Sequence, residues 1–248
     1  MSRRHPKRPL YLSYRVFQTE KDTGDCQDNY FPKKSYGRKR LSHPTYFGIL
    51  DGVSQSYNSR SWTDAILTSF QKHGFRFWNS LPHTAEMWME EQEKRISITF
   101  PVEFIQSLHR KCLDKVGGAT TLAFLQISPS GHFSVEGVGD SCMLLIRNGR
   151  VILQTPAVQV FGNSPEQVSS LYPFFNRKAV QKASGNLQKG DTVLLMSDAL
   201  CEWAMESLYR LDVLRRSSEQ ELLELVRNAQ ELTQMKVDDI TYMEICIW

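Results

Sequence analysis

The sequence predicts an α+β fold built on antiparallel strands, and three observations support this class. Residues 119–154 contain four short apolar runs separated by turn signals, with no helical segment between them. This pattern favours an antiparallel meander over βαβ units. Residues 61–116 and 200–233 instead place apolar residues at helical spacing. Strand-like runs also occur near both ends of the chain, so strands and helices follow one another in blocks.

The first fifth of the chain predicts two strands. Residues 10–17 (LYLSYRVF) are rich in aromatic and branched side chains, which is typical of a strand. Residues 31–45 combine Pro and Gly with a group of basic side chains and predict an exposed loop or hairpin tip. Residues 46–50 (YFGIL) predict a buried strand that ends at the Asp51-Gly52 turn.

Three helices are predicted in the middle of the chain. Residues 61–77 place their apolar side chains on one helical face. Pro82 is expected to break the helical pattern because it cannot donate a backbone hydrogen bond. Residues 84–94 and 101–116 predict the second and third helices, and Gly117-Gly118 ends the third.

The second half begins with the meander and ends on a strand. The predicted meander strands are residues 120–127, 132–138, 142–146 and 150–154, with Asn148-Gly149 as a hairpin turn. Residues 155–188 have little periodicity and predict an irregular insert. The remaining predicted elements are a strand at 192–196, helices at 200–209 and 218–233, the second capped by Ser218, and a closing strand at 239–247.

Composition limits the class of protein. The 248 residues, 41% hydrophobic and 23% charged, predict a globular protein without an evident linker, so we expect one domain over residues 10–248 behind a flexible basic arm, residues 1–9. Much of the net charge of +3 lies in that arm, which argues against a nucleic-acid-binding face. The five scattered cysteines contain no C-x-x-C pair and fit a reducing compartment. With no apolar run of membrane-spanning length, we expect a soluble, cytoplasmic protein. We also expect a monomer.

Acidic side chains lie at the edges of the strand-like runs. These residues are Asp28, Asp51, Asp140, Asp198 and Asp238. If they converge at one end of stacked sheets, their charges repel one another and a bound cation relieves the repulsion. Oxygen ligands select Mg²⁺ or Mn²⁺, and no histidine lies next to these positions to favour zinc. Each aspartate alone also fits a structural role in capping a turn, Asp140 most of all.

Six short motifs occur in a fixed order along the chain. They are Gln27-Asp28, YFGILDG ending at Gly52, GGATT from Gly117, VGDS from Val138, LLMSDAL from Leu194 and DDIT from Asp238. Each is weak alone, but the ordered set resembles the type 2C metal-dependent serine/threonine protein phosphatases, and their compact bacterial branch in particular. The resemblance implies a four-layer αββα sandwich, with two antiparallel sheets packed face to face between helices. It also implies hydrolysis of phosphoserine or phosphothreonine by a metal-activated water.

The resemblance implies a catalytic set as well. Asp51 resembles an aspartate that bridges two metal ions, and Gly52 would bind one of them through its backbone carbonyl. Asp198 and Asp238 resemble the remaining carboxylates of the first ion. Asp28 would act through water in the outer shell. The implied cofactors are therefore two Mn²⁺ or Mg²⁺ ions, and the implied partner is a phosphorylated protein whose phosphate is added by an opposing Ser/Thr kinase.

A third, looser metal site is found in some members of the family. Asp140, with Asp198 and Glu202, resembles the residues of that site. Glu202 lies one helical turn after Asp198, so both side chains could face the same ion.

The chain departs from the family pattern at several positions. Gln27 stands where some relatives have glutamate, Val53 where some have histidine, and Lys21 lies in the stretch where an arginine commonly binds phosphate. An active phosphatase is favoured by the retained aspartates. A catalytically weak or inactive pseudo-phosphatase that binds phosphoproteins is the alternative, and Gln27 and the absent arginine favour it. A third hypothesis is a nucleic-acid-associated factor that acts through the basic arm.

Overall fold

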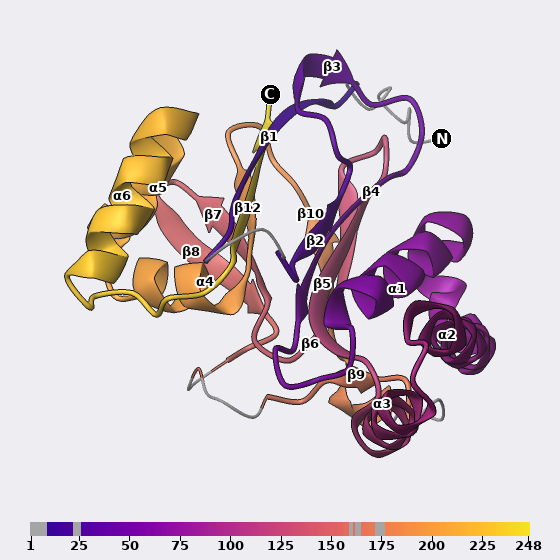
Figure 1. Cartoon of the computed structure of the whole chain (residues 1–248). Coiled ribbons are helices and arrows are strands. Elements are labelled where there is room, and N and C mark those ends of the chain that lie inside the picture. The colour runs from indigo at the N-terminus through magenta and orange to yellow at the C-terminus, as the bar shows by residue number, and fades with distance from the viewer. Residues whose placement is uncertain (1–8, 22–25, 159–160, 162–164, 172–176) are drawn as a thin grey trace, which may run out of the picture.

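The structure is a computed structural model, and it describes residues 9–21, 26–158, 161, 165–171 and 177–248. Two six-stranded antiparallel sheets pack face to face, and helices cover both outer faces (Figure 1). The predicted α+β class and four-layer αββα arrangement are therefore confirmed. The predicted basic arm lies outside the described residues except for Pro9.

The first sheet contains the first and last strands of the chain as neighbours. Its strand order is β3-β1-β12-β11-β7-β8. The strands are β1 (Tyr11–Thr19), β3 (Tyr36–Arg40), β7 (Cys142–Arg147), β8 (Arg150–Thr155), β11 (Thr192–Met196) and β12 (Ile240–Ile247). The pairing of β1 with β12 runs from Leu12 opposite Ile247 to Thr19 opposite Ile240. This pairing brings the residues just before β12 close to those just after β1.

The second sheet has the order β10-β6-β5-β4-β2, with the short β9 paired to β5. Its strands are β2 (Asn29–Phe31), β4 (Thr45–Gly52), β5 (Ala119–Ile127), β6 (His132–Val138), β9 (Val168–Ser169) and β10 (Gln181–Asn186). β4 pairs with β5 along its whole length, so that Asp51 lies opposite Thr121 and Gly52 opposite Thr120. The GGATT motif therefore supports the strand that ends in Asp51.

Helices form the two outer layers (Figure 1). The second sheet is covered by α1 (Ser59–His73), a 3₁₀ turn at Gly74–Arg76, α2 (Phe77–Thr99) and α3 (Glu103–Val116). The first sheet is covered by α4 (Asp198–Met205), α5 (Leu208–Arg216) and α6 (Glu219–Glu231). A further 3₁₀ turn spans Arg177–Ala179. No helix in the described part of the chain is long and apolar enough to cross a membrane.

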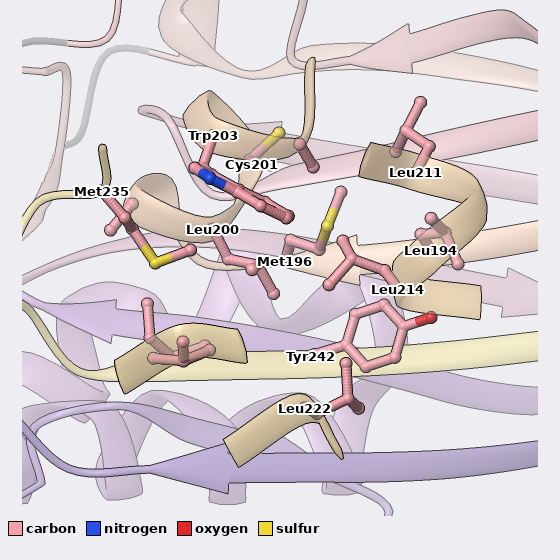
Figure 2. Close-up of a cluster of buried hydrophobic side chains, with 14 of the residues drawn as sticks. Leu194, Met196, Leu200, Cys201, Trp203, Leu211, Leu214, Leu222, Met235 and Tyr242 are labelled. Atoms are coloured by element: carbon pink, nitrogen blue, oxygen red, sulfur yellow. The ribbon is translucent and has the colours of Figure 1, made fainter. Parts of the chain in front are cut away.

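The central strands consist mainly of apolar residues because both of their faces are buried. Side chains alternate across a strand, so Val193 and Leu195 of β11 pack in the core between the sheets. Leu194 and Met196 point the other way, into the core beneath α4, α5 and α6 (Figure 2). Three tryptophans of the helical layers, Trp62, Trp88 and Trp203, are buried as well.

Two predictions about helices were wrong. Pro82 does not break the helix but lies near the start of α2. A proline there removes one backbone hydrogen bond, and α2 buries large side chains on both sides of it, including Trp78, Leu81 and Trp88. The helix predicted at 200–209 is two helices, α4 and α5, and Ser207 starts the second by accepting a hydrogen bond from the backbone of Arg210. The predicted capping by Ser218 is confirmed as a capping box with Glu221.

The predicted meander was also wrong, because the chain changes sheets in its middle. β5 pairs with β6 in the second sheet and β7 with β8 in the first. The Gly-Asp-Ser turn at residues 139–141 makes the crossing. Within residues 31–45 the structure has the strand β3, whose five residues are all exposed, so that no hydrophobic alternation marks it. Residues 155–188 likewise contain β9 and the edge strand β10 among their described residues.

Candidate functional site

Acidic residues from both sheets meet at one end of the sandwich. Asp51 lies at the end of β4, and Asp198 follows β11 as the first residue of α4. Asp28 directly precedes β2, and Asp238 lies two residues before β12. A cavity of about 350 Å³ is lined by Asp51, Asp140, Asp198 and Asp238 together with Gly52, Lys21 and Lys236. The structure therefore brings together the aspartates that the sequence placed at separate strand edges.

The carboxyl group of Asp51 lies among other carboxyl groups. Burial raises its pKa well above the ordinary value, and the charges of Asp28, Asp198 and Asp238 raise the pKa further. Carboxylates that face one another cannot all ionise without a compensating positive charge. The local electrostatics at Asp51 therefore favour a cation.

Asp28 is fully buried behind this cluster. Burial raises its pKa to about 7, although a hydrogen bond from Thr241 acts in the opposite direction. The hydroxyl of Thr241 donates to Oδ2 of Asp28 at 2.8 Å. The other oxygen, Oδ1, and the buried Oε1 of Gln27 have no hydrogen-bond partner among the described residues. Two neighbouring residues thus leave oxygen acceptors without a protein donor.

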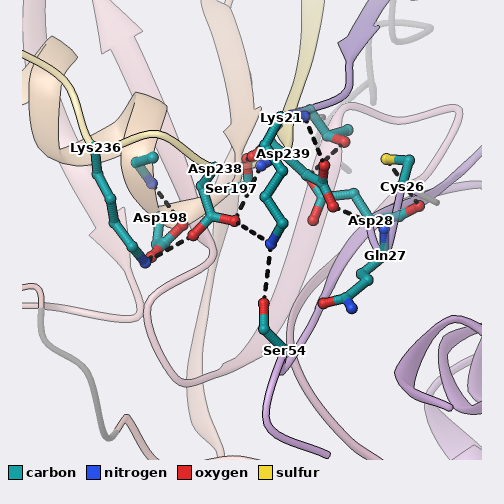
Figure 3. A network of polar contacts seen from close by, with 12 residues as sticks. Lys21, Cys26, Gln27, Asp28, Ser54, Ser197, Asp198, Lys236, Asp238 and Asp239 are labelled. Carbon is teal, nitrogen blue, oxygen red and sulfur yellow. Dashed lines mark hydrogen bonds and ion pairs between the residues drawn. The ribbon is translucent and has the colours of Figure 1, made fainter. Parts of the chain in front are cut away.

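Two lysines neutralise part of the cluster (Figure 3). The ammonium group of Lys236 lies 3.0 Å from Oδ2 of Asp198 and 2.8 Å from Oδ2 of Asp238. The ammonium group of Lys21 donates to Oδ1 of Asp238 at 3.0 Å and to the hydroxyl of Ser54 at 2.9 Å. Burial alone would raise the pKa of Asp238, but the two lysines outweigh it and hold the pKa below the ordinary value.

Asp239 organises the chain beside the cluster and was not singled out from the sequence. Its Oδ1 accepts a hydrogen bond from the backbone N–H of Lys21 at 3.0 Å, and its Oδ2 accepts one from the backbone N–H of Gln27 at 2.7 Å. One buried carboxylate therefore fixes two backbone positions next to the site (Figure 3). The Asp-Asp pair in DDIT was the available signal, and only its first member was taken as functional.

Asp140 lies on the cavity wall, in the turn where the chain crosses between sheets. Burial raises its pKa to about 7, and the charge of Asp198 raises it as well, with a smaller effect from Glu202. Glu202 lies on α4 and its side chain is exposed. Asp140 and Asp198 therefore share the cavity wall, whereas Glu202 does not line the cavity.

The donor chemistry fits a hard divalent cation. Carboxylate, amide and carbonyl oxygens are the ligands that Mg²⁺ and Mn²⁺ prefer, and the unpartnered oxygens of Gln27 and Asp28 are of this kind. Gly52 lies close to the backbone oxygen of Gln27. A Cβ atom on residue 52 would lie 2.8 Å from that oxygen, which is too close for any residue with a side chain. Across the ranges that the structure describes, however, no three His, Cys, Asp or Glu side chains are already arranged around one ion position. Lysines supply the nearest positive charges in this arrangement.

Comparison with family models and with curated proteins gave no match. Comparison with solved structures gave matches over nearly the whole chain. PppA, a key regulatory component of T6SS in Pseudomonas aeruginosa, is 17% identical with a TM-score of 0.64, covering 97% of this chain and 99% of that one.

Two further solved structures contain metal ions. The catalytic domain of the serine/threonine protein phosphatase PstP in complex with two manganese ions is 14% identical with a TM-score of 0.61, covering 96% of this chain and 99% of that one. RsbX in complex with magnesium is 16% identical with a TM-score of 0.54, covering 96% of each chain. At these identities the comparisons show the fold, which is that of the type 2C phosphatases, as the sequence motifs predicted.

Proposed function

We propose that this protein is a metal-dependent phosphatase that removes phosphate from phosphoserine or phosphothreonine of a protein partner. The observation that carries the proposal is the convergence of Asp51, Asp198 and Asp238 from both sheets on one cavity, where their mutual repulsion favours a cation. The shared fold with a manganese-bound serine/threonine phosphatase supports it.

The residues at the cavity would have the following roles in metal binding. Asp51, Asp198 and Asp238 would hold the cations, with the backbone carbonyl of Gly52, and Asp28 would support them from behind. Two Mn²⁺ or Mg²⁺ ions, when bound, would supply an activated water and stabilise the charge on the phosphoryl oxygens. Asp140, with Asp198 and Glu202, would form a weaker third site.

Lys21 would contribute to phosphate binding. Its ammonium lies on the cavity wall beside Ser54. The chain has no arginine in the stretch where the resemblance to type 2C phosphatases implies one. An ammonium is a point charge and cannot grip phosphate with two parallel hydrogen bonds as a guanidinium does. We therefore expect the phosphate to be bound more weakly than by an arginine. Other contacts with the protein substrate should then provide most of the affinity.

The biological setting follows from this activity. A phosphatase of this kind reverses the action of a Ser/Thr kinase on the same partner protein. Free thiols at all five cysteines fit a reducing compartment. We propose that the protein acts in signalling as a cytoplasmic monomer.

The alternative is a pseudo-phosphatase that binds a phosphoprotein without hydrolysing it. The ion pairs of Lys236 and Lys21 with Asp198 and Asp238 favour this alternative, because they supply positive charge without any metal. Such a protein would bind the phosphorylated form of its partner and protect or report that phosphate.

Hydrolysis assays separate the two functions. Hydrolysis of p-nitrophenyl phosphate and of a phosphothreonine peptide should be measured with chelator, Mn²⁺ or Mg²⁺, for the wild type and Asp51→Asn. Turnover that depends on metal and disappears in the variant would establish the phosphatase. Metal binding by calorimetry without turnover would favour the pseudo-phosphatase, and absence of metal binding would contradict the assignment of these aspartates as ligands.

A further inference from the structure

The positively charged ammonium of Lys236 forms ion pairs with two of the carboxylates proposed to bind metal. Its ammonium is 3.0 Å from Asp198 and 2.8 Å from Asp238, so it joins a residue of α4 to a residue that precedes β12 (Figure 3). One ammonium between two carboxylates leaves one net negative charge in this trio. The same two side chains would be needed to neutralise a divalent ion.

The two lysines of the site are held differently. Lys21 is fixed through its own backbone N–H by Asp239, and its ammonium is shared between Asp238 and Ser54. The side chain of Lys236 is 45% exposed, against 30% for Lys21. Since a lysine carries its charge on a long flexible stem, Lys236 can move its ammonium into solvent while its backbone stays in place.

A cation and an ammonium cannot use the same carboxylate oxygens at once. A divalent ion offers twice the charge of the ammonium, so it can replace Lys236 when its concentration is high enough. Metal binding then breaks the ion pairs of Lys236. The apparent affinity for metal is lower as a result, because the free energy of binding is the difference between the metal-bound state and the metal-free state with its ion pairs.

We propose that Lys236 is a built-in competitor of the divalent cation, which holds Asp198 and Asp238 in the metal-free protein and leaves them when metal binds. This inference rests on the proposed metal-dependent function. Lys236 then partly neutralises Asp198 and Asp238 in the metal-free protein, and it sets the metal concentration at which the site becomes loaded.

The test compares the full-length wild type with Lys236→Gln by calorimetric titration of Mn²⁺ after treatment with chelator. We expect about tenfold tighter binding in the variant, the size appropriate to a half-exposed ammonium bonded to two carboxylates. Thermal unfolding adds a second readout. In chelator the variant should unfold at a lower temperature than the wild type. Saturation with Mn²⁺ should raise the melting temperature of the variant by more than it raises that of the wild type.

Lys182→Gln provides a matched control. Lys182 pairs with Glu136 through a 2.6 Å ion pair between β10 and β6, away from the carboxylate cluster. Its loss removes the same charge and one ion pair, and should leave Mn²⁺ affinity unchanged within about twofold, because exposed charges act weakly at a distance.

The outcomes separate this inference from the proposed function. Tighter binding in Lys236→Gln alone supports the competitor role. Equal or weaker binding in Lys236→Gln, with clear binding by the wild type, overturns the competitor role and leaves the metal-dependent function standing. If neither protein binds Mn²⁺, both the competitor role and the proposed function are contradicted.

Discussion

Thr241 donates a 2.8 Å hydrogen bond from its hydroxyl to Oδ2 of Asp28, a residue that lies 213 positions earlier in the chain. The bond joins the last strand, β12, to the segment that enters β2. It also determines which oxygen of Asp28 remains free, because Oδ1 has no hydrogen-bond partner in the described part of the chain. The DDIT motif thus supports the acidic cluster through its threonine as well as through its aspartates.

Replacing Thr241 by Val should lower the free energy of unfolding by about 1–3 kcal/mol, the usual effect of removing a partner from a buried charged group. The loss should be larger at about pH 8 than at about pH 5, because the hydrogen bond favours the ionised form of Asp28. Urea denaturation at the two pH values measures both effects. Thr241→Ser, which retains the hydroxyl, should remain close to the wild type. An equal loss in both variants would contradict the assignment to the hydrogen bond, because Thr241→Ser keeps the hydroxyl that donates it.

Asp51→Asn should make the metal-free protein more stable while abolishing phosphatase activity. The substitution removes one charge from a group of mutually repelling carboxylates, and we expect a gain of about 1 kcal/mol at neutral pH or above. Thermal unfolding in chelator measures the gain. Saturating Mn²⁺ should stabilise the wild type but not the variant. A variant that is less stable than the wild type in chelator would show that Asp51 has a structural role instead.

The stability of the metal-free protein should fall as the pH rises. The pKa values of Asp28 and Asp140 are about 7 in the folded protein, above the value of about 3.9 in the unfolded chain. The folded state therefore holds more protons between these values, so stability decreases through this window and the full penalty is present above pH 7. Asp238, whose pKa is lowered, changes its contribution only at more acidic pH.

Bound metal should oppose this pH dependence. Carboxylate ligands bind metal in their deprotonated form, so the stabilisation by Mn²⁺ should be larger at about pH 8 than at about pH 5. Melting temperatures with and without Mn²⁺ at both pH values measure the effect. Calorimetry in buffers of different ionisation enthalpy should detect proton release on binding. A melting temperature in chelator that rises from pH 5 to pH 8 would contradict the raised pKa values.

The sequence predicted those parts of the fold in which local pattern and burial agree. The central strands β4, β6 and β11 were placed within two residues of their bounds because they are apolar runs that end in sharp turns. The edge strand β3 was missed because all five of its residues are exposed, and its pairing with β1 provides no side-chain periodicity. The chain crossing after β6 was missed because a Gly-Asp-Ser turn looks the same within a sheet and between two sheets.

The site was predicted as far as strand ends and motif order allow. Asp51 lies at the end of a buried strand, and Asp198 follows another. Their approach to each other depends on the packing of two sheets, which the resemblance to type 2C phosphatases implied. Lys236 could not have been found in this way, because its contacts depend on where a long side chain from an irregular segment points. Local sequence contains no signal for such a contact.

Asp239→Ala should weaken metal binding without touching a proposed ligand. The substitution leaves the backbone N–H groups of Lys21 and Gln27 without their carboxylate acceptor, which should cost about 1–3 kcal/mol of stability. Because these two residues lie beside the cavity and beside Asp28, their displacement should reduce Mn²⁺ affinity by about tenfold or more. Calorimetric titration and urea denaturation of the same samples measure both quantities.

Asp191→Ala is the matched control for Asp239→Ala. Asp191 is also buried, accepts a hydrogen bond from the backbone N–H of Gln188 at 2.7 Å and pairs with Arg147 at 2.7 Å, but it does not line the cavity. Its loss should destabilise the fold by a similar amount and leave the Mn²⁺ affinity of the folded protein unchanged. If both variants lose affinity equally, the effect of Asp239 follows from general destabilisation. If only Asp239→Ala loses affinity, the carboxylate positions the segment that completes the metal site.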